Sequence, residues 1–310
     1  STVSVDINLN ANMMNLASFN VNIESSIYEL LGEVPFIMSD DNGNFYVPSL
    51  GVDQLGGFEN EGYYCYISGF SDLTLTVEGY PVDPGTTMTL EPYKANMLPY
   101  LPQEPMDTDY VFGEYYDDIL LITNDMGQFN VPQFNINQIT TLYPGEAYQV
   151  ILSGDSSIEF SYPDVSSTRS KDVGQYGFSS QYEESKSRHY EFSVTGVSYP
   201  IVIEPENLTL NVGDEIAAYA GGQVVGATRV VDPSSPIIVS ASRGFSSYGV
   251  ELPGFTDGDE IQLKLYRHYT GEELDLCSDL DNSEYGAGFM SVGTVSIVSV
   301  SIPEDFALSQ

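Results

Sequence analysis

The stretch "DDNGNFYVP" (residues 40–48) returns as "NDMGQFNVP" (residues 124–132), 84 positions later (124 minus 40). The likeness continues in "EGYYCYISG" (61–69) and "EAYQVILSG" (146–154), with one residue added in the second copy. The matching residues are Val47, Pro48, Gln54, Glu61, Tyr63, Ser68 and Gly69 with Val131, Pro132, Gln138, Glu146, Tyr148, Ser153 and Gly154. We therefore predict an internal duplication, before any fold is assumed.

Each copy has the pattern of a small β domain. Short runs such as "SVDINLN" (4–10) and "SIEFSY" (157–162) alternate apolar and polar residues, which is typical of half-buried strands. The dipeptide Asn42-Gly43 predicts a two-residue type I′ hairpin, in which both central residues need a positive φ.

One short helix is predicted in each copy. In "SSIYELLG" (25–32), Ser26 is the expected N-cap, Glu29 completes a capping box and Gly32 ends the helix. In "DTDYVFG" (107–113), Asp107 and Gly113 take the same places.

The remaining chain predicts a linker and a third module. Residues 164–189 are rich in serine and carry four of the nine basic residues. From 190 onward, turn signals separate strand-like runs about every ten residues, which favours an antiparallel sandwich. The predicted fold is all-β and mostly antiparallel: a first repeat (1–82), a second repeat (83–163), the linker (164–189) and an immunoglobulin-like β-sandwich (190–310).

Charge narrows the classes of partner. Forty-five acidic residues against nine Lys and Arg give a net charge of −36, which repels nucleic acid and anionic membranes. Such a charge favours a saline or divalent-rich medium outside the cytoplasm. No apolar run has the ~18 residues of a membrane span, and a chain starting at Ser1 without a leader is expected of a mature exported protein. Cys65 and Cys277 form no disulfide framework, so one bridge or two free thiols are both open.

Catalytic motifs are absent from the sequence. Neither a G-x-S-x-G elbow, an H-E-x-x-H pair nor a glycine-rich phosphate loop occurs, and the two histidines are His189 and His268. His268 alternates with Tyr266 and Lys264 on one predicted strand face, as an ordinary surface histidine does. We expect no enzyme and no cofactor.

Calcium is the one metal that the sequence suggests. The segment "DLCSDLDNSE" (275–284) offers closely spaced oxygen ligands, although an acidic solvated loop explains it equally well. The turn "SDDNGN" (39–44) is a second, weaker candidate. The candidate calcium ligands are Asp275, Asp279, Asp281 and Glu284.

Tyrosines and basic residues are the remaining candidates. Six tyrosines could serve packing and protein interfaces, the favoured interpretation, or a platform for sugar rings; they are Tyr63, Tyr64, Tyr66, Tyr115, Tyr116 and Tyr148. The linker's basic residues are either solvated or dock onto the acidic face of a neighbouring copy; they are Arg169, Lys171, Lys186 and Arg188.

Three motifs resemble modules of large secreted bacterial proteins. "MMNLASFNVN" (13–22) and "LYPGEAYQVIL" (142–152) resemble the opening and closing strands of tandem β repeats, without the tryptophan of that pattern. "LNVGDEIAAYAGGQVVGA" (210–227) resembles a GDEI-type sandwich module, and "SIPEDFALSQ" (301–310) is similar to the segment before the carboxy-terminal sorting domain of type IX secretion substrates. The resemblance implies export to the surface or exterior of a Gram-negative bacterium with type IX secretion.

These observations together predict a secreted, non-catalytic structural or adhesive subunit. It would self-assemble into a filament or sheath, or bind other cell-surface proteins. The alternative is a carbohydrate-binding accessory protein of the cell surface, and a carboxylate-based glycan hydrolase is the least favoured class.

Overall fold

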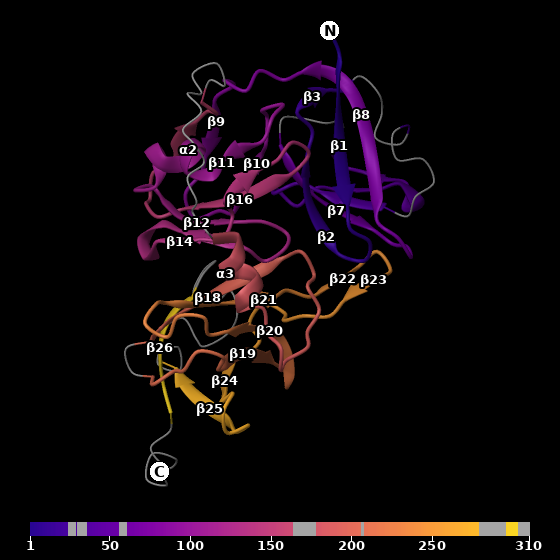
Figure 1. The fold of residues 1–310 in the computed structure, drawn as a ribbon. Coiled ribbons are helices and arrows are strands. Elements are labelled where there is room, and N and C mark those ends of the chain that lie inside the picture. The colour runs from indigo at the N-terminus through magenta and orange to yellow at the C-terminus, as the bar shows by residue number, and fades with distance from the viewer. Residues whose placement is uncertain are drawn as a thin grey trace. The chain divides into compact units, whose positions relative to one another are not determined.

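The computed structural model describes residues 1–23, 29, 36–55, 61–163, 178–205, 208–278 and 296–302. The chain divides into two compact units, Ser1–Phe178 and Ser179–Gln310 (Figure 1). Strands dominate, nearly all pair antiparallel, and the helices are few and short. The predicted all-β fold is confirmed. Within the described ranges, no helix combines the length and apolar character needed to cross a lipid bilayer.

The first repeat folds into two sheets. Its elements are β1 (Val3–Leu9), β2 (Met14–Ser18), β3 (Val21–Asn22), β4 (Phe36–Ser39), β5 (Phe45–Val47), the 3-10 turn η1 (Pro48–Leu50), β6 (Val52–Asp53), β7 (Gly62–Ile67) and β8 (Leu73–Pro81). The larger sheet has the order β2-β7-β4-β5-β6, and the smaller one β1-β8-β3. Alternate residues of β1 (Val5, Ile7 and Leu9) are buried, as the sequence alternation predicts.

The second repeat has the same strand order. Its elements are β9 (Met88–Leu90), β10 (Asn96–Pro99), β11 (Met106–Asp107), α2 (Thr108–Phe112), η2 (Gly113–Tyr115), β12 (Ile119–Thr123), β13 (Phe129–Val131), η3 (Pro132–Phe134), β14 (Ile136–Asn137), β15 (Thr141–Leu142), β16 (Ala147–Leu152) and β17 (Ile158–Phe160). Its large sheet runs β10-β16-β12-β13-β14, and β9 pairs with β17 as β1 pairs with β8. The duplication read from the sequence is therefore also a duplication of structure.

The repeated phrase builds one particular turn, and it is not the predicted type I′ hairpin. Gly43 has a φ of 81°, whereas Asn42 is not among the residues with positive φ. The Asp40 carboxylate accepts the backbone N–H groups of Asn42 and Asn44, and Asp40 N–H donates to Asn44 C=O. These bonds close a three-residue loop with one left-handed glycine, because the side chain at the head of the turn holds both N–H groups.

The helix of the second repeat begins as predicted and ends differently. Asp107 accepts the N–H of Tyr110 and caps α2. Gly113 is right-handed, with a φ of −55°, and the chain continues into η2 instead of stopping there. The predicted helix of the first repeat lies outside the described residues, except for Glu29, which is helical.

The second unit is dominated by a sheet of seven strands. The elements that follow the repeats are α3 (Phe178–Ser185), β18 (Ser198–Glu204), β19 (Glu215–Ala220), β20 (Gln223–Arg229), β21 (Ile237–Ser242), β22 (Phe245–Ser247), β23 (Val250–Leu252), β24 (Gln262–Tyr266), β25 (Glu273–Ser278) and β26 (Ser296–Ser301). The order is β20-β19-β24-β25-β26-β18-β21. The two end strands meet, since a Cβ added to Gly226 of β20 would stand 2.2 Å from the Ser240 carbonyl oxygen of β21. The sheet therefore curls over one core in a sandwich-like form.

Two features of this unit depart from the predicted pattern of antiparallel strands. The strand β18 pairs parallel with β26, because apolar alternation marks a strand without giving its direction. Residues 189–197, where the predicted linker meets the predicted sandwich, are irregular. Their polar groups bind side chains and turns instead of a ladder: His189 N–H binds Glu215, and the Thr195 hydroxyl binds the Arg243 carbonyl.

Candidate functional site

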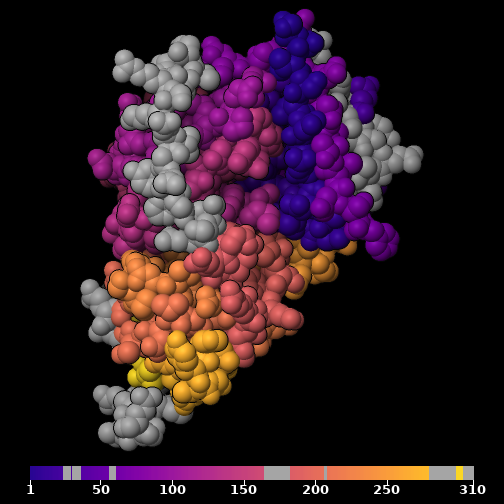
Figure 2. Space-filling model, viewed as in Figure 1, coloured from indigo at the N-terminus to yellow at the C-terminus, as the bar shows by residue number. Residues whose placement is uncertain are grey.

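The two repeats face each other across an interface built from β2 and β7 of the first and β10 and β16 of the second. The strand β2 contacts β16 while its counterpart β10 contacts β7. In Figure 2 the indigo surface of the first repeat adjoins the magenta surface of the second. Gly62 lies against Ala147, its own equivalent in the second copy, and a Cβ added to Gly62 would stand 2.8 Å from the Ala147 Cβ. A residue that meets its own equivalent marks a two-fold axis. The repeats are thus arranged like the halves of a homodimer, which we call the pseudo-dimer.

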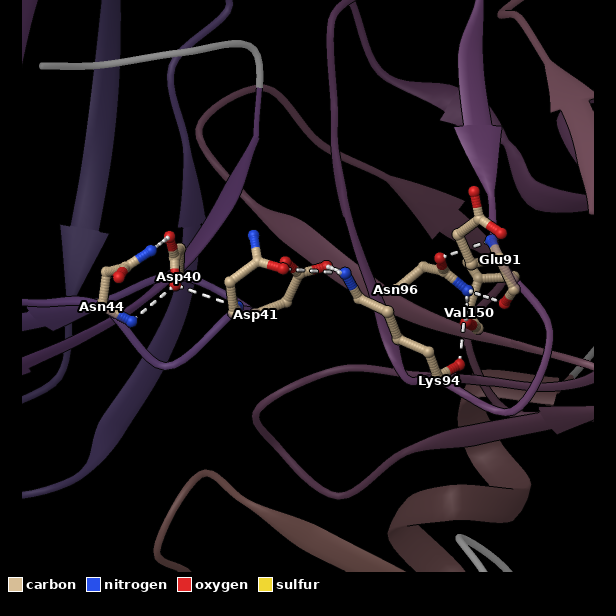
Figure 3. Close-up of polar contacts among 8 residues, drawn as sticks. Asp40, Asp41, Asn44, Glu91, Lys94, Asn96 and Val150 are labelled. Atoms are coloured by element: carbon tan, nitrogen blue, oxygen red, sulfur yellow. Dashed lines mark hydrogen bonds and ion pairs between the residues drawn. The ribbon is translucent and has the colours of Figure 1, made fainter.

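The repeated turns are reciprocal contacts of the pseudo-dimer. Asp41, in the turn of the first repeat, forms an ion pair with Lys94 of the second, with 2.8 Å between Oδ2 and Nζ (Figure 3). Asp125, at the same place in the turn of the second repeat, accepts the Leu16 N–H of the first at 2.9 Å. In each repeat, therefore, the turn contacts the opening segment of the other repeat.

Asp125 has an unusual environment for a carboxylate. Its pKa is raised to about 7, because the effect of burial exceeds the lowering by the Leu16 N–H bond and the nearby Glu146 carboxylate raises the pKa as well. Burial, with Asp125 as a secondary cause, also raises the pKa of the Cys65 thiol. Both cysteines are free, Cys65 buried and Cys277 exposed, which decides the question that the sequence leaves open.

The "LYPGEAY" segment closes the interface of the pseudo-dimer. Gly145 has a φ of 87°, its carbonyl accepts the Ser18 N–H, and a Cβ there would stand 2.5 Å from the Asp6 carbonyl oxygen. The Ser18 hydroxyl donates to the Glu146 carbonyl and accepts the Tyr100 N–H. The glycine is required because the first repeat approaches its Cα directly.

A duplicated buried asparagine was missed by sequence reasoning. Asn15, the second residue of β2, donates to the Asn10, Met13 and Cys65 carbonyls. Asn96 opens β10 and donates to the Glu91, Lys94 and Val150 carbonyls, as Figure 3 shows. Each also accepts the N–H five residues before it. A sequence signal existed, since both asparagines stand at equivalent places before apolar residues, but a polar residue near the start of a strand gives no hint of burial.

A cleft of about 600 Å³ opens on the second repeat. Around it, the Asp109 carboxylate accepts the Tyr116 hydroxyl at 2.5 Å and the Asn137 Nδ2 at 3.2 Å. Burial, followed by the Asp109 contact, raises the pKa of Tyr116, which therefore stays a neutral phenol. The lining residues are Asp109, Tyr116, Asp117, Ile119, Leu120, Asn130, Pro132, Gln133, Asn135, Ile136, Asn137 and Ser153.

In the second unit, the "GDEI" motif holds loops. Asp214 is fully buried and accepts Arg267 Nη1, the His268 N–H and the Asn211 N–H. Glu215 accepts the Arg188 N–H, the His189 N–H and the Ser187 hydroxyl. Both carboxylates are buried and accept hydrogen bonds from neighbouring loops, so they hold those loops in place.

The six predicted tyrosines are dispersed. Tyr63, Tyr66 and Tyr148 are buried, which removes them from a surface platform for sugar rings. Tyr64 is half-buried in β7, and half-buried Tyr115 packs on Phe160 of the second repeat's core. Only Tyr116 lines the cleft.

The predicted calcium ligands fall mostly outside the described residues. Asp279, Asp281 and Glu284 lie there, while Asp275 is exposed on β25 with its carboxylate 3.5 Å from Lys264 Nζ. In the turn at 39–44, Asp40 accepts backbone N–H groups, so the hairpin accounts for that acidic residue. Among the residues that the structure describes, no cluster of three or more metal-binding side chains occurs.

The structure describes part of the basic segment and both histidines. Arg169 and Lys171 lie outside the described residues. Lys186 pairs with Glu183, and Lys186 and Arg188 belong to a segment held on the sandwich through Thr228 and Glu215, so this part of the predicted linker is docked. His189 stacks on Tyr266, with 3.6 Å between ring centroids. His268 is exposed in a turn after β24 rather than on the predicted strand.

Comparison with known proteins returns no match among protein-family models, curated proteins or solved structures.

Proposed function

We propose that this chain is a secreted, non-catalytic structural or adhesive subunit of the cell exterior. The observation that carries the proposal is how the duplicated polar residues are used. Asn15, Asn96, Asp40 and Asn124 all bind backbone groups and fix the shape of the repeats. Side chains used in this way build a rigid body, and they are not free for acid, base or nucleophile chemistry.

The pseudo-dimer supports a mechanical role. Backbone and side-chain hydrogen bonds join the repeats at Ser18, Gly145 and Glu146. Movement of one repeat past the other would break these bonds and expose apolar surface. A structural or adhesive subunit needs this stiffness.

The net charge supports an exterior location and suggests control of assembly. A charge of −36 keeps copies apart at low ionic strength. Salt or divalent cations would relieve the repulsion and permit contact between copies. Pairing of sheet edges between chains would involve edges other than β2, because β2 already bridges to Glu146 through Ala17.

Electron microscopy and sedimentation of the purified chain test this proposal, at low and high salt and with or without millimolar calcium. We expect monomers at low salt and ordered assemblies once the charge is screened. A single monomeric species under every condition would contradict the self-assembling part of the proposal. Turnover of any glycan in a hydrolysis panel would contradict the non-catalytic part.

A further inference from the structure

The cleft on the second repeat has the chemistry of a site for an uncharged, hydroxyl-rich ligand. Its described lining residues include two carboxylates, several amides, a tyrosine and a serine, but no Lys or Arg. Without a cation, the site gives an anionic ligand nothing to pair with and two like charges to avoid. Amides and carboxylates together offer both donors and acceptors, which hydroxyl groups need.

The central polar groups of the cleft are held in place before any ligand arrives. Asp109 fixes the Tyr116 hydroxyl and the Asn137 amide from two sides. Asn137 makes this contact although its own Oδ1 stays buried without a hydrogen-bond partner. A buried acceptor left unsatisfied costs about 1 to 3 kcal/mol, and such exceptions are found preferentially at functional sites.

The first repeat provides an internal comparison for the cleft. Gln133, Asn135 and Asn137 of the second repeat stand where the first has Ser49, Gly51 and Asp53. These two chain segments have the same local structure, a 3-10 turn that ends at a left-handed residue. The second repeat therefore carries three amides on a backbone that the first builds without any.

The backbone does not require the Asn135 amide. The Asn135 φ of 53° lies in the left-handed region, where Gly51 has a φ of 66°. Glycine adopts this conformation most easily, although asparagine tolerates it better than most residues. The second repeat thus uses the less favourable residue at a position that lines the cleft.

We propose that this cleft binds an uncharged segment of a polysaccharide, with amides and Asp109 contacting hydroxyl groups and the Tyr116 ring packing against the apolar face of a sugar. Its volume lies within the range of about 300 to 1,000 Å³ that is usual for ligand pockets. The proposal rests on the proposed function, because it names the class of ligand through which an adhesive subunit would hold its surface.

Calorimetric titration of the full chain with neutral hexasaccharides of glucose, mannose or xylose tests the proposal, with oligomers of a uronic acid as the anionic comparison. The key variant is Gln133→Ser with Asn135→Gly, which installs the residues of the first repeat. We expect this variant and Tyr116→Ala to raise the Kd for at least one neutral sugar about tenfold or more. Tyr116→Phe, which keeps the ring, guards against loss of folding in the alanine variant.

The matched control is Tyr143→Ala, because Tyr143 is an exposed tyrosine of the same repeat outside the cleft. Its Kd should equal that of the unmodified chain. The proposal is overturned by no binding of any neutral sugar at millimolar concentration, by equal binding of the uronic acid, or by normal binding of both Tyr116→Ala and the double variant. Sugar binding by monomers requires no assembly, so the two proposals fail separately. Intact sugar binding without assembly contradicts only the proposed self-assembly. Assembly without sugar binding contradicts only the proposed ligand site.

Discussion

The turns Asp40–Asn44 and Asn124–Gln128 have the same local structure and opposite electrostatic surroundings. In each, a carboxylate or amide at the head binds two backbone N–H groups, and Gly43 or Gly127 is left-handed. Asp41 of the first turn meets Lys94, whereas Asp125 of the second meets a backbone N–H near Cys65 and Glu146.

The difference comes from the segment that each turn contacts. The first turn contacts the opening segment of the second repeat, which carries Lys94, while that of the first repeat has Met13 at the equivalent place. The same aspartate is therefore paired in one copy and partly desolvated in the other. The duplication preserved the local geometry of the turn, whereas the segment that contacts the turn sets the pKa of its aspartate.

The largest effect is expected from removing the duplicated asparagines. Asn96→Leu leaves the Glu91, Lys94 and Val150 carbonyls without their side-chain donor, and Asn15→Leu does the same in the first repeat. We expect each to lower the free energy of unfolding by about 3 kcal/mol or more, measured by urea denaturation. A loss of stability in only one of the two variants would show that the two asparagines do not have equivalent roles in the repeats.

Gly145→Ala should have the next largest effect. The substitution forces a Cβ onto a residue with a φ of 87° and against the Asp6 carbonyl oxygen. We expect a loss of about 2 kcal/mol or more in the same denaturation assay. The control is Gly43→Ala, where φ is 81° but nothing lies within 4 Å of the added Cβ, so backbone strain alone should cost about 1 kcal/mol. Equal losses would argue against close contact of the repeats at Gly145.

Asp125→Asn should change how stability depends on pH. Because the folded pKa of about 7 lies above the unfolded value of about 3.9, the folded state holds a proton that the unfolded state releases between these values. The Asp125 contribution is therefore most favourable below pH ~4 and is lost as pH rises through ~7. We expect the variant to lack this slope and to gain about 1 to 2 kcal/mol at pH ~8, measured as unfolding free energies from pH ~4 to ~8.

Asp41→Asn supplies the comparison for that titration. It removes a carboxylate from the matching turn, and the Asp125-dependent slope should persist unchanged. If the slope vanished in the Asp41→Asn variant instead, the titrating carboxylate would be Asp41 of the first turn, and the prediction for Asp125 would be wrong.

The smallest effect is expected from Lys94→Met, which gives the second repeat the residue of the first. The Lys94 and Asp41 side chains are 33% and 17% exposed, so the ion pair is partly screened by water. We expect a loss of about 0.5 to 1 kcal/mol at low salt that fades at high salt. A loss that is independent of salt would show that packing, rather than charge, matters at this contact.

Much of the fold could be predicted because it depends on neighbouring residues. The matching of Gln54 with Gln138 in the two copies indicates the duplication directly. The alternation of apolar and polar residues in β1 predicts a half-buried strand, and Asp107 predicts the start of α2. The type I′ turn was the local error, since the Asp40 side chain, and not the Asn42-Gly43 pair alone, selects the loop. Of the residues that line the cleft, only Tyr116 was a candidate from the sequence.

What the sequence determined by itself is therefore the β class, the two copies and the acidic surface, which follow from residue order and composition. What only the tertiary structure decided is that Gly62 meets Ala147, that Asp125 is half-buried near Cys65, and that α2, η3 and β14 line a cleft. These features join residues far apart in the chain. Strand and turn patterns repeat every few residues and do not encode which faces meet, so contacts across the pseudo-dimer and the cleft are fixed by packing alone.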